Sequence, residues 1–103
     1  METNNLDMYV IRRRSGWQSP EELQEGAARS GHVGDNEMSE DIRWIRSYVV
    51  GEADGTLGTV CIYLASSEEK IREHAARAGI PAHDVLPVLD TVIVRPDPQL
   101  AAA

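Results

Sequence analysis

The sequence predicts an α+β protein with a four-stranded antiparallel sheet and two helices in the order βαββαβ, the ferredoxin-like arrangement. Two segments with helical patterns each begin at a capping motif. Four β-rich segments surround them: one before the first helix, two in succession between the helices, and one after the second. In this order both helices are expected on one face of the sheet.

The first strand is expected at residues 6–13, where apolar and β-favouring side chains mix, and Gly16 ends it. The first helix begins at residues 19–22, which form a capping box: a serine cap, a proline at the first helical position, and a glutamate three residues after the cap. Its end is marked less sharply because glycines weaken the helix. Residues 34–41 are expected to form an acidic loop or a frayed last turn.

Residues 42–50 and 59–64 predict two strands of a hairpin, joined by a turn at 51–58. Alternation in the first strand sends Trp44, Arg46 and Tyr48 to one face. In the second strand it separates an aliphatic face from a face with Thr59, Cys61 and Tyr63. The aliphatic face is made by Val60, Ile62 and Leu64. We expect the aliphatic face to take the helices, which leaves the aromatic, polar face outside.

The second helix is expected to begin at a capping box made by Ser66 and Glu69. Gly79 followed by Pro81 ends this helix. Residues 85–94 are rich in valine and predict the last strand. Because this strand contains a proline near its start, it is expected at a sheet edge or with a bulge.

The length of 103 residues fits one domain. We expect a flexible N-terminus at residues 1–5, a single ferredoxin-like domain at 6–95, and a disordered tail at 96–103. A domain of this size buries a thin core, and association with a second copy can supplement that core.

The net charge of −7 disfavours nucleic acid as a partner, because the phosphate backbone is also negative. The only basic cluster, at residues 12–14, lies at a strand end. A solvated rim is the preferred interpretation of this cluster, and a patch that binds a phosphate or an acidic ligand is the alternative. No apolar segment reaches membrane length, and the N-terminus lacks the apolar core of a signal peptide. The single cysteine, Cys61, suits a reducing compartment, so a cytoplasmic location is expected.

An exposed aromatic face on a sheet is usually covered, and a second subunit is the economical cover. Two sheets packed face to face would form a dimeric α+β barrel, with a homodimer as the expected assembly and a pocket inside it. The residues expected to bind a ligand there are Trp44, Arg46, Tyr48, Cys61, Tyr63 and His74.

Each of these residues also has a plain structural interpretation. His74 is either a packed histidine bonded to a neighbour or a proton-transfer group at the barrel mouth. Cys61 is either a small buried hydrophobe or a thiolate stabilised by Arg46. Arg46 either binds an anionic head group or stacks on a neighbouring aromatic ring. The other aromatic side chains are dimer-interface core or ligand contacts, and Trp17 either packs on the first helix or closes over the barrel.

Two classes of function fit this pattern. The first is a non-catalytic binding or sensing dimer that holds a small anionic or aromatic molecule, or a divalent metal. The second is a cofactor-free enzyme of the dimeric α+β barrel type, an oxygenase or isomerase, with His74 or Glu73 as general base. No paired carboxylates or nucleophile–base motif supports catalysis, so binding is the preferred hypothesis.

Three segments resemble a family of small bacterial proteins of unassigned biochemical role, some of which are described as nickel-binding. The segments are WIRSYV at 44–49, CIYLA at 61–65 and IREHAARAGIPA at 71–82. The resemblance covers residues 9–94 and implies a ferredoxin-like fold that is commonly a dimer. Nickel-described members carry a histidine where this chain has Arg12 and Arg13, and some others have one at the position of Arg46. An arginine cannot replace a metal-binding imidazole, so the cofactor is left unknown.

Overall fold

The computed structural model describes residues 6–98 of the chain. The expectations for residues 1–5 and for 99–103 therefore lie outside the described residues. The elements in chain order are β1 (Asp7–Trp17), α1 (Pro20–His32), the π-helical turn η1 (Val33–Glu37), β2 (Ile42–Gly51), β3 (Leu57–Ala65), α2 (Glu68–Ala78) and β4 (Asp84–Pro87).

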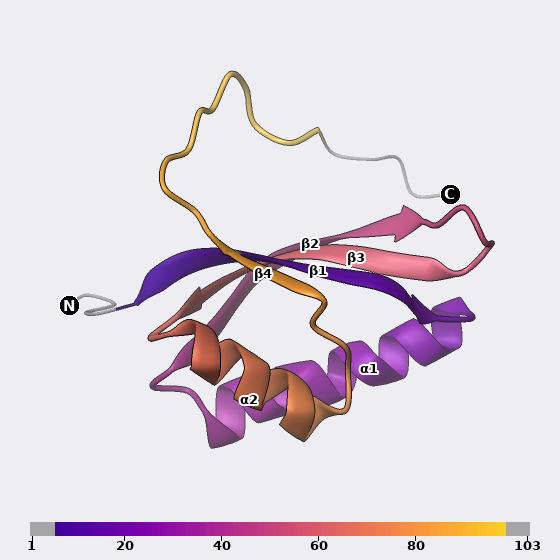
Figure 1. Ribbon diagram of the computed structural model, residues 1–103, viewed down its shortest axis with the longest axis horizontal. Helices are drawn as coiled ribbons and strands as arrows, with labels where there is room; N and C mark the ends of the chain where they lie inside the picture. Colours follow the sequence, from indigo (N-terminus) through magenta and orange to yellow (C-terminus); the bar gives the residue numbers. More distant parts are fainter. Residues whose placement is uncertain (1–5, 99–103) are drawn as a thin grey trace.

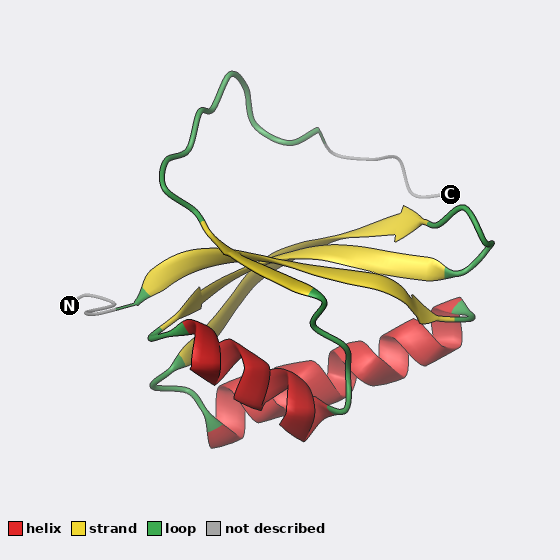
Figure 2. Cartoon of the chain, in the orientation of Figure 1, coloured by secondary structure: helices red, strands yellow, loops and turns green. Residues whose placement is uncertain are grey.

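The four strands form one antiparallel sheet in the order β2-β3-β1-β4. Both helices lie against one face of this sheet, and the chain after β4 passes over the other face (Figure 1). Figure 2 shows the same two layers coloured by secondary structure. The α+β class is as expected, and the strand order is compatible with a ferredoxin-like fold. No helix within residues 6–98 is long and apolar enough to cross a membrane.

Helix α1 begins as its sequence predicts. The Ser19 hydroxyl accepts a hydrogen bond from the Glu22 amide at 3.2 Å, and the Glu22 carboxylate accepts one from the Gln18 amide at 2.9 Å. Of the two expectations for residues 34–41, a last helical turn fits the first part and a loop does not, because η1 continues the helix to Glu37. Burial of Val33 and Met38 holds this extra turn against the core, and the Met38 amide donates to the Val33 carbonyl at 2.9 Å.

Helix α2 is capped one residue later than expected. Ser67, not Ser66, accepts the hydrogen bond from the Lys70 amide, at 3.2 Å. Ser66 instead donates to the Asp41 carboxylate at 2.8 Å and so joins the end of β3 to the start of β2. The helix ends as predicted at Gly79, which has a left-handed backbone (φ 71°) that glycine adopts without strain.

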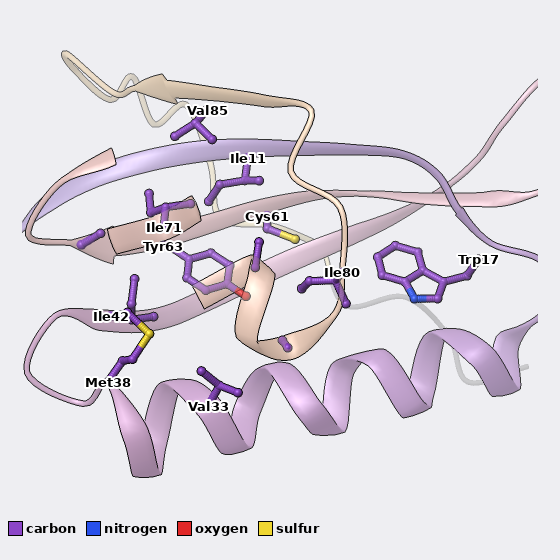
Figure 3. Close-up of a cluster of buried hydrophobic side chains, with 13 residues drawn as sticks. Ile11, Trp17, Val33, Met38, Ile42, Cys61, Tyr63, Ile71, Ile80 and Val85 are labelled. Atoms are coloured by element: carbon purple, nitrogen blue, oxygen red, sulfur yellow. The ribbon is translucent and has the colours of Figure 1, made fainter. Parts of the chain in front are cut away.

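The expected assignment of the sheet faces is inverted. Cys61 and Tyr63 are 4% and 1% exposed and lie among the buried side chains between the sheet and the helices (Figure 3). The aliphatic residues between them on β3, such as Ile62, point to the outer face and are only partly buried. Because α1 presents small residues, Gly26 and Ser30, to the sheet, it leaves room for bulky side chains on the inner face.

A β-bulge in β2 separates Trp44 from Arg46 and Tyr48. Trp44 pairs with Tyr63, whereas Arg46 pairs with Ile62, so Ile45 is an extra residue in the strand. Paired residues of an antiparallel ladder share a face, which places Trp44 on the inner face and Arg46 on the outer face. The prediction that the three side chains share one face is therefore wrong.

The strands at both ends of the chain also differ from expectation. β1 is longer than predicted and runs to Trp17, with an irregular register after Arg13. β4 stops at Pro87 instead of Val94. Tyr9 of β1 pairs with Pro87, and the Val88 amide still donates to the Met8 carbonyl at 2.9 Å. Because β1 begins at Asp7, the residues beyond Leu89 have no partner in this strand.

Candidate functional site

An apolar cavity of about 170 Å³ lies between α1 and the hairpin of β2 and β3. Its wall is made mainly by aromatic and aliphatic side chains, namely Trp17, Leu23, Trp44, Val49, Tyr63 and Ile80. Trp17 ends β1 and lies 6% exposed against α1, next to Gly26. Of its two expected roles, packing on the first helix is the one that this position fits.

Arg13 is the charged residue of this cavity. It follows Tyr9 and Ile11 on the inner face of β1 and is 1% exposed. Its Nη1 donates to the Pro81 carbonyl oxygen at 2.5 Å, and its Cζ lies 5.7 Å from the centre of the Tyr63 ring. Its Nη2 is buried without a hydrogen-bond partner in the described part of the chain.

Sequence reasoning placed Arg13 in a solvated rim with its neighbours, and this is wrong. Arg12 is partly buried and pairs with Glu52 at 3.0 Å, and Arg14 is exposed and pairs with Asp84 at 2.7 Å. The signal that distinguishes Arg13 is its place in the alternation of β1, two residues after the buried Ile11.

A buried polar chain joins β3, α1 and α2. The Tyr63 and Ser30 hydroxyls are 2.8 Å apart, and Nε2 of His74 is 3.0 Å from the Ser30 carbonyl oxygen. Burial raises the pKa of the Tyr63 phenol and lowers the pKa of the His74 imidazole. Both groups are therefore neutral at physiological pH, as a core hydrogen-bond chain requires.

His74 matches its structural interpretation as a packed histidine, because it is 0% exposed and bonded to a neighbour. It lies below Tyr63, with the two rings in edge-to-face contact at 5.3 Å, and is not among the residues that line the cavity. Its role in ligand binding or proton transfer stays a prediction.

A second polar cluster lies on the outer face of the sheet. Arg46 Nη1 and the Tyr48 hydroxyl both donate to the same Asp97 carboxylate oxygen, at 2.7 Å and 2.5 Å. These bonds raise the pKa of Arg46 and lower the pKa of Asp97, with the Tyr48 hydrogen bond the largest cause for Asp97. Arg46 and Tyr48 on β2 are thus arranged to hold a carboxylate, and Asp97 supplies that carboxylate.

The six predicted ligand residues fall into two groups. Trp44, Cys61 and Tyr63 line the inner cavity, with His74 beneath them, while Arg46 and Tyr48 belong to the outer cluster. Because the sheet separates Cys61 from Arg46, this arginine of the same chain cannot stabilise a Cys61 thiolate. The Cys61 thiol instead donates to the Thr59 hydroxyl at 3.3 Å and is buried, which matches its interpretation as a small core residue.

The comparisons with known proteins identify one relationship. A family model described as "Nickel responsive protein SCO4226-like" matches residues 9–88 of the chain. No curated protein and no solved structure matches.

Proposed function

Because this chain belongs to the family of SCO4226-like nickel-responsive proteins, we propose that it is a small binding and sensing protein that works as a homodimer. Its ligand, a small anionic or aromatic molecule, is held between the outer faces of two sheets. This proposal rests on the hydrogen bonds that Arg46 and Tyr48 donate to the Asp97 carboxylate. These bonds mark a position on the outer face where an anionic group is bound.

The outer face has the composition of an interface. No helix covers it, and partly buried aliphatic side chains run across its strands (Figure 1). They include Met8 and Val10 on β1 and Val60, Ile62 and Leu64 on β3. The segment after β4 adds Leu89, Val92, Ile93 and Val94, which are 76–92% exposed. Apolar surface of this kind favours association, and a second copy would bury it.

The donor side chains of the described residues do not form a nickel site. Among residues 6–98, no three side chains of the His, Cys, Asp and Glu types gather closely enough to hold an ion. His74 is buried, and His83 accepts a hydrogen bond from the Arg14 amide at 2.8 Å. A nickel response of this protein is therefore proposed without metal ligands assigned among residues 6–98.

Native mass spectrometry of protein purified without tags or chelators tests the proposal, because it reports subunit number and retained non-protein mass together. We expect the wild type to be a dimer with retained mass. The variant Arg46→Ala should remain a dimer and lose that mass. Arg72→Ala, which removes an exposed arginine of α2, is the matched control and should behave as the wild type.

A monomeric wild type would contradict the proposal, and so would a retained mass that Arg46→Ala leaves unchanged. A second spectrum after addition of nickel chloride examines the metal response. We expect nickel to add mass to the dimer and not to any monomer present.

A further inference from the structure

We propose that the cavity between α1 and the hairpin of β2 and β3 is a separate binding site for a small monocarboxylate with an apolar body, and that Arg13 pairs with its carboxylate. This site lies on the opposite side of the sheet from Arg46. It does not depend on dimerisation, because all of its lining residues belong to one chain.

Arg13 carries a buried charge that its neighbours compensate only in part. A buried guanidinium is strongly disfavoured unless an anion and hydrogen-bond acceptors compensate it. Arg13 is 1% exposed, yet no carboxylate of the described residues pairs with it, and its Nη2 has no acceptor. The Pro81 carbonyl and the Tyr63 ring compensate the charge in part. The missing partner is an anion with an acceptor oxygen.

The size of the cavity limits the size of the ligand. The cavity holds about 170 Å³. An apolar cavity of about 150 Å³ in another protein accommodates benzene, so this one has room for a single six-membered ring or a short branched chain. A larger ligand would have to displace the side chains of the wall.

The residues that line the cavity favour a particular charge and polarity of the ligand. Arg13 is the one charged residue in a lining of apolar and uncharged polar side chains, and its unpaired guanidinium nitrogen matches one negative charge. A phosphate dianion would bring an uncompensated charge into the cavity. The aromatic rings of Trp17, Trp44 and Tyr63 match a flat apolar body. A monocyclic aromatic carboxylate has both features.

The cavity also communicates with solvent. Trp44 and Val49 line it and are 37% and 54% exposed. Gln24 of α1 also lines the cavity and is exposed. A ligand can therefore enter between α1 and β2 without unfolding of the core.

Tryptophan fluorescence measures this binding directly, because both tryptophans of the chain line the cavity. The probe is benzoate, with cyclohexanecarboxylate and isobutyrate as smaller or non-aromatic acids and benzamide as the uncharged isostere. We expect saturable quenching or a spectral shift with at least one acid, and an affinity for benzamide that is weaker by about tenfold or more. Inorganic phosphate should produce no saturable change.

Two variants locate the site. Arg13→Met removes the charge and should abolish carboxylate binding, while Arg14→Met removes a neighbouring exposed arginine and should bind as the wild type. Ala27→Leu fills the cavity from a half-buried position of α1 with a good helix former, keeps Arg13, and should also abolish binding. It keeps the proposal testable if Arg13→Met does not fold. The proposal is overturned if none of the three acids binds the wild type, or if folded Ala27→Leu or Arg13→Met binds them with unchanged affinity.

In the native mass spectra, a retained mass that is lost with Arg13→Met and kept with Arg46→Ala would support this site and contradict the site on the outer face. A retained mass that is kept with Arg13→Met and lost with Arg46→Ala would support the site on the outer face and contradict this one. The two proposals can therefore fail independently.

Discussion

The hydroxyl groups of Tyr63 and Ser30 lie 2.8 Å apart and join the centre of the sheet to α1. This bond allows Tyr63 to be buried on the inner face of the sheet. A tyrosine can be buried when its hydroxyl finds a partner, and Ser30 supplies that partner from the helix. Tyr63 in turn stacks on Trp44, with ring centres 6.0 Å apart, and so helps to form the wall of the cavity.

Ser30→Ala should destabilise the protein by about 1 to 3 kcal/mol, because it leaves the Tyr63 hydroxyl buried without its partner. Tyr63→Phe should cost less, and the double variant should be more stable than the sum of the two single effects predicts. Urea unfolding of the four proteins measures these terms. Strictly additive effects would show that the two hydroxyls do not interact.

The stability of the fold should fall as the pH is lowered through the range of histidine titration. Burial, and then the charge of Arg13, lowers the pKa of His74 in the folded state, so below about pH 6.5 the unfolded state binds the extra proton. The stabilisation by neutral His74 is complete above that pH and is lost progressively below it, by at most about 1.4 kcal/mol per pH unit.

His74→Gln is the control for this pH dependence, since its amide can replace the hydrogen bond to Ser30 without titrating. The difference in unfolding free energy between wild type and variant should shrink as the pH falls from about 7.5 to 5.5. An identical pH profile for wild type and His74→Gln would show that another group causes the effect.

Arg13→Met should raise the unfolding free energy of the ligand-free protein by about 1 kcal/mol. The physical reason is that methionine fills much of the same space and removes an uncompensated charge from the interior. Arg14→Met provides the comparison on the same strand and should leave thermal unfolding unchanged. A large loss of stability in Arg13→Met alone would mean that the bond to Pro81 and the contact with Tyr63 satisfy the arginine fully.

Asp97→Asn should strengthen the binding of added carboxylates at Arg46. The Asp97 carboxylate occupies the donors of Arg46 and Tyr48, and an amide competes for them less strongly. Titration with acetate, followed by the NMR signal of the Arg46 side chain, measures the change in affinity. Because the ion pair is exposed, thermal unfolding should be unchanged. Equal acetate affinities for wild type and variant would contradict the role of Arg46 as an anion holder.

The sequence predicted the elements better than it predicted their faces. The proline and serine signals located the start of α1, and Gly79 located the end of α2. Alternation showed which residues of β3 share a face, but alternation alone does not say which face the helices cover. The deciding information was the small size of Gly26 and Ser30 on α1, because a helix with small residues packs against large ones.

The candidate site was predicted only in part. Trp44, Cys61 and Tyr63 do line one space, but the bulge at Ile45 sends Arg46 and Tyr48 to the other side of the sheet. A bulge adds one residue without a distinctive sequence signal here, so regular alternation fails beyond it. The charged residue of the cavity was missed because the neighbouring arginines made residues 12–14 resemble one solvated cluster.

The central claim, that two copies join through the outer faces of their sheets, is tested most directly by sedimentation velocity of the wild type and of Ile62→Glu. Ile62 lies at the centre of the outer face, away from the helices, so a charge there should prevent association and leave the fold intact. Ala76→Glu on the exposed side of α2 is the matched control. We predict a dimer for the wild type and Ala76→Glu and a folded monomer for Ile62→Glu. A monomeric wild type, or a dimer that Ile62→Glu leaves intact, would contradict the account.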